Sequence, residues 1–256
     1  MKFFRRALEL ALIAIGLAAM TGGARAQTNT QENDVRVNDI PAKFTPPRTG
    51  YDYVKRVEMV PMRDGVKLYT VIVVPKGAAH APMILTRTPY DAASRAQRVE
   101  SPHMSAELPQ GDEVFVGAGY IRVFQDVRGK YGSEGNYMMV PPPLGPLNTT
   151  GTDDTTDAYD TIDWLVKNVP ESNRKVGMLG SSYEGFTVVM ALIHPHPALK
   201  VAAPESPMVD GWMGDDWFHY GAFRQNNLDY LTFQTTARGK GLAIPRNGRD
   251  DYTNYL

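Results

Sequence analysis

The chain has 256 residues, and 27 Lys and Arg against 28 Asp and Glu leave a formal net charge of −1. This balance argues against nucleic acid as a partner, because domains that bind nucleic acid normally carry a clear basic excess. The sequence holds no cysteine, which excludes disulfide bonds, thiolate metal ligands and a cysteine nucleophile. Its 43% of hydrophobic residues is typical of a globular protein with a packed core.

Residues 1–26 have the three-part pattern of a secretory signal peptide. A short basic start, residues 1–6, is followed by an apolar run at residues 8–20 and by Ala24-Arg25-Ala26, the small-x-small pattern that signal peptidase cleaves. The apolar run is too short to span a bilayer. We therefore expect cleavage after Ala26 and a secreted or periplasmic protein that does not associate with the membrane once the signal is removed.

The next segment, residues 27–50, is polar and contains prolines, so we expect an extended arm. Residues 54–60 and 66–74 are strand-like and are separated by a turn that contains Asp64-Gly65, a pair that tolerates positive φ. The predicted sheet therefore begins with an antiparallel hairpin.

Strands and helices then alternate as far as residue 206. The predicted strands are residues 82–88, 120–127, 175–179 and 200–204, and the predicted helices are residues 152–167 and 182–193. This alternation predicts an α/β domain at residues 51–206, with a mostly parallel sheet covered by helices on both faces. Aromatic residues crowd into residues 207–256 without the same rhythm, and we expect the start of a helical cap there.

The chemical signal is Gly180-Ser181-Ser182-Tyr183-Glu184-Gly185, between a predicted strand and a predicted helix. A serine in such a turn exposes its hydroxyl, and the next backbone N–H, at the helix N-terminus, can stabilise an oxyanion. Ser182 lies two residues after Gly180, as the G-x-S-x-G pattern requires, and is preferred over Ser181. The second glycine comes one residue later than in that pattern. A plain Gly/Ser turn that opens a helix is the alternative.

Together with Asp126-Val127-Arg128-Gly129 and Ser133-x-Gly135, this motif resembles the serine hydrolases of the Xaa-Pro dipeptidyl-peptidase (S15) and cocaine-esterase-like (CocE/NonD) group. Residues 208–217 are most similar to one branch, the α-amino-acid ester hydrolases, which are secreted enzymes that acylate and deacylate β-lactam antibiotics. The resemblance runs from about residue 51 to the last residue. It implies an α/β-hydrolase fold and a small-molecule ester or amide substrate, and it leaves a homo-oligomer of the full-length protein open.

The resemblance also implies roles for individual residues. Ser182 would be the nucleophile, and the N–H of Tyr183 and the hydroxyl of Tyr90 would form the oxyanion hole. Asp216 would belong to a carboxylate cluster that binds the α-ammonium group of the substrate, with Asp215 as the runner-up. The residues alone leave other interpretations open: Tyr90 as a packed core tyrosine, and Asp216 as half of a solvated acidic pair with Asp215.

A serine hydrolase of this kind also needs an Asp and then a His after the serine, and the resemblance places both beyond the cap. We therefore expect the sequence to be the N-terminal part of a longer enzyme, truncated within the cap and inactive alone. The trio Ser182, Asp216 and His219 has the required order, but a triad is defined by geometry. We expect all five histidines to be loop or surface residues: His80, His103, His194, His196 and His219.

No phosphate-loop or zinc-ligand spacing occurs in the sequence, so we expect no cofactor and no metal. Two other functions remain as alternatives. One is a serine peptidase that cleaves after Xaa-Pro, and the other is a non-catalytic secreted α/β binding module.

Overall fold

A computed structural model describes residues 50–210, 213–214, 218–223, 228–237, 244–250 and 252–253. The predicted signal peptide, nearly all of the predicted arm, Asp215 and Asp216 lie outside these residues. Among the described helices, none is both long enough and apolar enough to pass through a bilayer.

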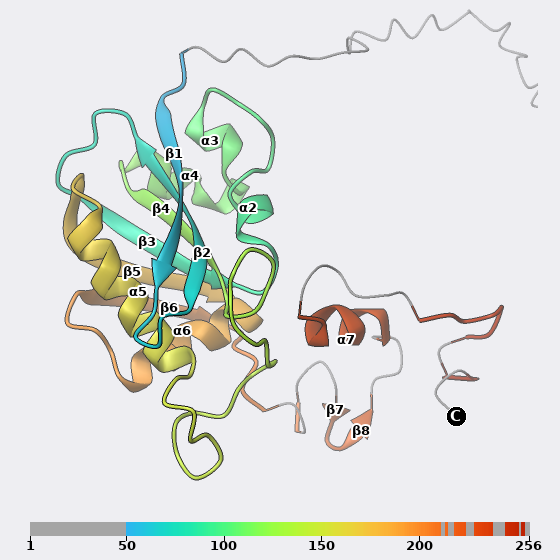
Figure 1. Ribbon diagram of the computed structural model, residues 1–256. Coiled ribbons are helices and arrows are strands. Elements are labelled where there is room, and N and C mark those ends of the chain that lie inside the picture. The colour runs from blue at the N-terminus through green and yellow to red at the C-terminus, as the bar shows by residue number, and fades with distance from the viewer. Residues whose placement is uncertain are drawn as a thin grey trace, which may run out of the picture. The chain divides into compact units, whose positions relative to one another are not determined.

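The centre of the structure is a six-stranded sheet with the strand order β1-β2-β4-β3-β5-β6 (Figure 1). β1 pairs antiparallel with β2 and β2 antiparallel with β4, whereas the remaining pairs are parallel. This topology confirms the predicted mostly parallel sheet with an antiparallel start. The strands are β1 (Tyr53–Pro61), β2 (Lys67–Pro75), β3 (Ala81–Thr88), β4 (Ile121–Asp126), β5 (Ser172–Ser181) and β6 (Leu199–Glu205).

Helices cover both faces of the sheet, as predicted. α5 (Asp154–Asn168) and α6 (Tyr183–Ile193) pack on one face, where Ile162 and Val188 join a buried cluster with Leu85 of β3. The short helices α2 (Ala92–Arg95) and α3 (Met104–Glu107) pack on the other face. The alternating side chains of β2 and β4 contribute to both clusters, which is the period-two pattern of a strand buried on both sides. The segment that follows α3 contains a 3₁₀ turn (Gln110–Asp112) and α4 (Glu113–Gly117).

The start of α5 is defined by a capping box. The Asp153 carboxylate accepts the Thr156 N–H at 2.9 Å, and the Thr156 hydroxyl accepts the Asp153 N–H at 2.9 Å. These two bonds satisfy amide groups that the first turn of a helix leaves without partners. Asp153 also accepts the Leu144 N–H at 2.8 Å, so the same side chain holds the preceding loop against the helix.

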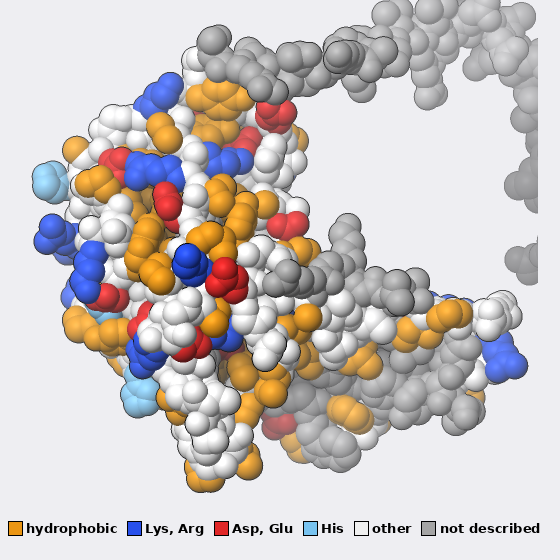
Figure 2. Space-filling model, viewed as in Figure 1, with side chains coloured by type: hydrophobic (Ala, Val, Ile, Leu, Met, Phe, Trp, Pro, Cys, Tyr) orange, Lys and Arg blue, Asp and Glu red, His pale blue; other side chains and the backbone are white. Residues whose placement is uncertain are grey.

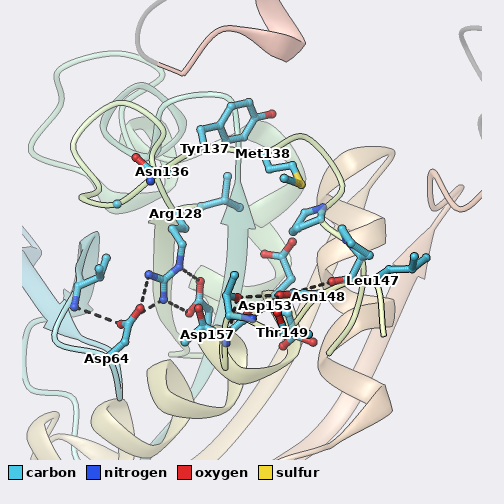
Figure 3. A pocket seen from close by; sticks show the side chains of 18 of the residues that line it. Asp64, Arg128, Asn136, Tyr137, Met138, Leu147, Asn148, Thr149, Asp153 and Asp157 are labelled. Carbon is cyan, nitrogen blue, oxygen red and sulfur yellow. Dashed lines mark hydrogen bonds and ion pairs between the residues drawn. The ribbon is translucent and has the colours of Figure 1, made fainter. Parts of the chain in front are cut away.

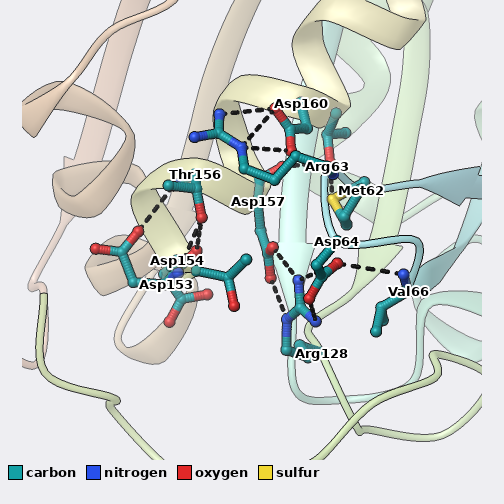
Figure 4. A network of polar contacts seen from close by, with 12 residues as sticks. Met62, Arg63, Asp64, Val66, Arg128, Asp153, Asp154, Thr156, Asp157 and Asp160 are labelled. Atoms are coloured by element: carbon teal, nitrogen blue, oxygen red, sulfur yellow. Dashed lines mark hydrogen bonds and ion pairs between the residues drawn. The ribbon is translucent and has the colours of Figure 1, made fainter. Parts of the chain in front are cut away.

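Two arginines tie the β1–β2 turn to α5 (Figure 4). Arg63 forms a bidentate pair with Asp160, with nitrogen–oxygen distances of 2.9 and 2.8 Å. Arg128, which follows β4, bridges Asp64 of the turn and Asp157 of α5 at 2.7 and 2.6 Å. The hairpin that begins the sheet is thus fastened to α5 by charge-assisted hydrogen bonds.

After residue 207 the described residues include a small hairpin, β7 (Phe218–His219) with β8 (Ala222–Phe223), and the helix α7 (Leu228–Thr235). A helix was expected in this segment, whereas its sequence pattern did not indicate the hairpin. On the face of the molecule that Figure 2 shows, acidic and basic side chains are interspersed rather than gathered by sign.

Candidate active site

Ser182 occupies the turn between β5 and α6, with φ 59° and ψ −120°. Non-glycine residues rarely adopt such a positive φ, and they keep it only where the surroundings enforce it. Here the Ser182 N–H donates to the Glu205 carbonyl at 3.0 Å, and the Ser182 carbonyl accepts N–H groups from Phe186 at 2.9 Å and Met208 at 3.3 Å. The backbone of Ser182 is therefore held by the end of β6 and by the first turn of α6.

The hydroxyl of Ser182, unlike its backbone, is available to react with a substrate. The side chain is partly exposed, and its hydroxyl makes no hydrogen bond with any residue that the structure describes. Gly180 makes the turn possible, because a β-carbon at that position would lie 2.6 Å from backbone atoms of Glu184. The structure thus places Ser182, and not Ser181, at the sharp strand-to-helix turn, since Ser181 is the last residue of β5.

The backbone N–H of Tyr183 is the first of α6 and donates to no acceptor among the described residues. Free N–H groups at a helix N-terminus, together with the helix dipole, form a site that favours negative charge. The side chain of Tyr183 points elsewhere: its ring is buried, and its hydroxyl oxygen accepts the Val140 N–H at 3.2 Å. Burial, followed by the nearby charge of Asp154, raises the pKa of this phenol well above its usual value.

Tyr90 reaches the same edge of the sheet from the neighbouring strand. It follows β3 by two residues, Ser182 follows β5, and β3 and β5 are adjacent and parallel. The ring of Tyr90 packs against the buried cluster that contains Tyr183. Its hydroxyl contacts two residues of α7, the Tyr230 hydroxyl at 2.9 Å and the Gln234 amide nitrogen at 3.1 Å. Among the described hydrogen bonds, none joins Tyr90 directly to Ser182.

A salt bridge links the segment after Tyr90 to the Ser182 turn. Arg95 of α2 pairs with Glu184 of α6 through two nitrogen–oxygen contacts of 3.0 and 2.8 Å. Glu184 is buried and lies in the first turn of α6, where the helix dipole favours an acidic side chain. The pair was not predicted, because its partners are 89 residues apart and neither belongs to a local pattern.

The last residue of β4 and the loop after it supply two buried charged side chains, Asp126 and Lys130. Asp126 accepts the N–H groups of Ala92 at 2.7 Å and Gly132 at 3.1 Å, and burial raises the pKa of its carboxyl to about 6. Lys130 donates to the Phe233 carbonyl at 2.8 Å, near the end of α7. Burial lowers the pKa of Lys130 to about 8, although the charge of Asp126 acts in the opposite direction. Asp126 was noted only as part of a family motif and Lys130 was not part of it, so the structural roles of both appear only with the fold.

All five histidines lie among the described residues, and no hydrogen bond joins any of them to Ser182. His196 is largely buried, with its ring 4.6 Å from that of Tyr159 and one nitrogen 3.6 Å from Asp163. His219 lies in β7 against the ring of Tyr220. The others are in turns or at helix ends: His80, His103 and His194. Asp216 and Asp215 lie outside the described residues. The structure therefore tests neither the trio Ser182, Asp216 and His219 nor the expected ammonium site.

A cavity of about 620 Å³ lies between the loop after β4, the start of α5 and the β1–β2 turn (Figure 3). Neither Ser182 nor Tyr90 lines it, although the side chain of Tyr183 does. Arg128, on its wall, is already paired with Asp64 and Asp157; burial opposes its charge, but the two carboxylates raise its pKa. The cavity is therefore separate from the exposed serine, and we do not place the chemistry there.

No group of three or more His, Asp or Glu side chains is arranged to hold a metal ion in the described part of the chain. This edge of the sheet presents the Ser182 hydroxyl and the Tyr183 N–H, neither with a hydrogen-bond partner among the described residues, and the Tyr90 phenol just after the adjacent strand. This set of groups supplies a nucleophile for attack on a carbonyl and donors for the oxyanion that results, and the attack needs a general base in addition.

Several solved structures are similar to this chain in sequence and fold. An α-amino acid ester hydrolase is 65% identical, with a TM-score of 0.79, and the match covers 89% of this chain and 36% of that one. An aminopeptidase from the marine sediment archaeon Thaumarchaeota archaeon is 56% identical, with a TM-score of 0.77, over 85% of this chain and 36% of that one. A CocE/NonD family hydrolase from Staphylococcus aureus, at 20% identity and a TM-score of 0.55, shares the fold. The chain thus has the α/β-hydrolase fold that its sequence predicted.

Sequence comparison gives the family. Residues 64–256 match the model of the X-Pro dipeptidyl-peptidase (S15) family, and the chain belongs to this family of hydrolases. Cocaine esterase from Rhodococcus sp. (strain MB1 Bresler) is 35% identical over 189 residues, which are 74% of this chain and 29% of that protein. A putative serine esterase from Mycobacterium bovis is 29% identical over 195 residues, again 29% of that protein. The chain spans about a third of the length of the relatives that it matches.

Proposed function

We propose that the protein is a serine hydrolase that cleaves, and transfers, the acyl groups of α-amino acyl esters and β-lactam amides through an acyl-enzyme on Ser182. The observation that carries the proposal is the conformation of Ser182, which combines a positive φ, a backbone held at both sides and a hydroxyl without a partner among the described residues. A buried structural serine would be expected to use its hydroxyl in a hydrogen bond.

In this mechanism the Ser182 oxygen attacks the ester carbonyl carbon while a general base takes the hydroxyl proton. The carbonyl oxygen becomes an oxyanion that accepts hydrogen bonds from the Tyr183 N–H and the Tyr90 hydroxyl. The alcohol or amine then leaves with a proton, and water releases the acyl group from Ser182 by the same steps in reverse. Since none of the five histidines forms a hydrogen bond with Ser182, we propose that the base and its carboxylate partner come from outside the described residues.

The proposed preference for α-amino acyl groups requires a carboxylate that binds the ammonium group of the substrate. Asp216 is our candidate for this anion. The 65% sequence identity to a solved α-amino acid ester hydrolase supports a preference for the same kind of substrate. A fixed carboxylate favours a protonated amine over an acyl chain that lacks one, because the charged hydrogen bond is lost with the latter.

Covalent labelling of the full-length protein with a fluorophosphonate tests the nucleophile. We expect Ser182→Ala to abolish labelling and ester hydrolysis, and Ser181→Ala, a matched change at the neighbouring serine, to leave both within about threefold. Tyr90→Phe should lower kcat by about 100-fold, the usual effect of removing one oxyanion donor. Labelling that persists in Ser182→Ala would overturn the proposal.

The substrate preference needs a separate comparison. We expect a phenylglycine methyl ester to be hydrolysed faster than the matching phenylacetate ester, which lacks the amine. Asp216→Asn should remove most of this difference by raising KM for the amino ester alone, and Asp215→Asn tests the runner-up in the same way. Equal rates for the two esters in the unmodified protein would contradict an ammonium site.

A peptidase that cleaves after Xaa-Pro is the second candidate, and the match to the X-Pro dipeptidyl-peptidase family model favours it. Such an enzyme would use the same turn and the same phenol. An Ala-Pro anilide, tested beside the phenylglycine ester on the full-length protein, separates the two functions. A non-catalytic binding module is the remaining alternative, and it predicts no labelling of Ser182 at all.

We also propose that the protein is exported, on the strength of the charge and hydropathy pattern of residues 1–26. Mass spectrometry of the protein recovered from the periplasm or the medium should give an N-terminus at Gln27. A protein that is recovered from the cytoplasm and retains Met1 would contradict this proposal.

A further inference from the structure

The end of α7 is held by side chains of the loop that follows β4. Lys130 donates to the carbonyl oxygens of Phe233 and Thr236, and the Tyr137 hydroxyl donates to the Gln234 carbonyl at 2.6 Å. Lys130 is fully buried, and its ammonium lies 5.0 Å from the centre of the Phe233 ring. Carbonyls at the C-terminal end of a helix favour a cation, so these contacts fix where the last turn of α7 lies.

The anchored turn carries the side chain of Gln234 to the Tyr90 hydroxyl. Gln234 is 1% exposed, and its amide nitrogen lies 3.1 Å from the Tyr90 oxygen and 2.7 Å from the Tyr230 oxygen. The two phenol oxygens are 2.9 Å apart. Because an amide NH₂ has two hydrogens and accepts none, both hydrogens are used and both phenol oxygens act as acceptors toward Gln234.

The hydrogen bonds that Tyr90 already accepts determine which one its hydroxyl can still donate. Its oxygen accepts from Gln234, so its own O–H is the remaining donor, and it points either to Tyr230 or to a bound substrate. A phenol oxygen that accepts a hydrogen bond becomes a better donor, because neighbouring hydrogen bonds polarise one another. The reversed amide would accept the phenol proton instead and would draw it away from the Ser182 side. In the reversed orientation the two N–H groups of the Gln234 amide would be buried without partners. In the present orientation only one buried acceptor, Gln234 Oε1, has no partner among the described residues.

We propose that Gln234 is a positioning residue for the Tyr90 hydroxyl: its side-chain amide occupies the acceptor side of the phenol oxygen and directs the O–H toward the carbonyl oxygen of an ester bound at Ser182. This inference rests on the proposed function, because it needs Tyr90 to act as an oxyanion donor. It adds that the donor is prepared by a residue 144 positions further along the chain, on α7.

The test compares three variants of the full-length protein by steady-state ester hydrolysis. Gln234→Glu keeps the size of the side chain but replaces the donating nitrogen with an accepting oxygen. We expect its kcat to fall by about 100-fold near neutral pH, with KM within about threefold, because the Tyr90 proton then turns to the carboxylate. Gln234→Met, which removes the amide and keeps the length, should lower kcat by about tenfold. Thr235→Ala, an exposed neighbour on the same helix, should leave kcat unchanged.

The pH profile distinguishes positioning from a merely structural role. A protonated glutamic acid can donate to the phenol oxygen as the amide does, so kcat of Gln234→Glu should recover relative to the unmodified protein as the pH is lowered. Gln234→Met should show no such recovery. Lys130→Met, which loosens α7 without touching the amide, should lower the thermal stability of the protein and should likewise not recover at low pH.

The outcomes separate this inference from the function on which it rests. If Tyr90→Phe does not lower kcat, the proposed function fails at its oxyanion donor. If Tyr90→Phe lowers kcat but both Gln234 variants keep the unmodified kcat, or if Gln234→Glu and Gln234→Met have the same pH profile, the positioning role of Gln234 is wrong and the proposed function stands.

Discussion

Gly185 lies directly against the carbonyl oxygen of Glu205: a β-carbon at position 185 would sit 2.5 Å from that oxygen. The same oxygen accepts the Ser182 N–H at 3.0 Å, so the end of β6 must pass close to the first turn of α6 to hold the serine turn. This contact explains why the second glycine of the motif falls three residues after Ser182 instead of two. It stands where the neighbouring strand leaves no room for a side chain.

Substitution of this glycine should therefore damage the turn. We expect Gly185→Ala to lower the free energy of unfolding by about 1–3 kcal/mol, as overpacking in a dense region does, and to slow fluorophosphonate labelling of Ser182. Gly117→Ala, at the end of α4, is the control, since a β-carbon there would meet open space. Urea unfolding and labelling kinetics measure both effects. A Gly185→Ala protein that labels at the unmodified rate would contradict this account of the motif.

The Arg95–Glu184 pair should link the position of the Tyr90 loop to that of the Ser182 turn. Glu184→Gln removes one charge of a bidentate pair, and we expect a loss of about 1–2 kcal/mol of stability, moderated because the Arg95 side chain is 40% exposed. A double-mutant cycle with Arg95→Met measures the coupling between the two side chains. Lys167→Met, which breaks a solvent-exposed pair with Asp163, is the matched comparison and should have little effect. A coupling energy near zero for Arg95 and Glu184 would refute the link.

Arg87 should be among the costliest residues of the sheet to replace. Its side chain is fully buried and donates to Gln125 at 3.0 Å and to the backbone carbonyl and carboxylate of Asp154 at 3.0 and 3.1 Å. Arg87→Met would leave a buried carboxylate without its partner, which typically costs about 3–5 kcal/mol. Arg63→Met, which breaks the more exposed pair with Asp160, should cost less than about 1 kcal/mol. Chemical denaturation compares them, and equal losses would argue against the buried network.

Asp126 should make stability depend on pH in an unusual direction for a carboxylate. Its pKa is 3.8 in the unfolded chain and about 6 in the folded protein, because burial disfavours the charge, so the folded state binds more protons between these values. The contribution of Asp126 is therefore fully present below pH 3.8 and is lost as the pH rises through 6, a change of about 3 kcal/mol.

Asp126→Asn cannot titrate, so its stability should lose this component. We expect the difference in unfolding free energy between the unmodified protein and the variant to shift in favour of the variant as the pH rises from 4 to 7. Asp163→Asn, a surface change, should not reproduce the shift. Curves for the unmodified protein and Asp126→Asn that run parallel over this range would show that Asp126 keeps an ordinary pKa.

The long elements of the fold could be predicted because their signals are local. The apolar run Val71–Val74 in β2 and the acidic cap at Asp153 each specify an element by residues that lie next to one another. The strand β5 begins three residues earlier than predicted, at Ser172, because its polar first residues carry no strand signal. The short helices α2 to α4 were missed, since each has four or five residues and depends on packing against the sheet.

The candidate site divides in the same way. The turn at Ser182 could be predicted because the glycine and serine spacing that it needs lies within six residues. The partners of Tyr90 could not, because Tyr230 and Gln234 reach its hydroxyl only through the docking of α7. The partly buried pair of Arg95 and Glu184 likewise joins two segments that the strand order brings together, and no local sequence pattern contains that order.

The outer strand β6 has a neighbour on one side only in the six-stranded sheet that the structure describes, and Val201 on it is 65% exposed. A row of backbone donors and acceptors along its free border can recruit any extended polypeptide, including an identical molecule. The last residue of this strand, Glu205, is also the one whose carbonyl steadies Ser182. A segment that pairs with this edge of β6 would therefore also stabilise the position of Ser182. Strand pairing, within the protein or between two molecules, and the conformation of the nucleophile would be coupled through the Glu205 carbonyl.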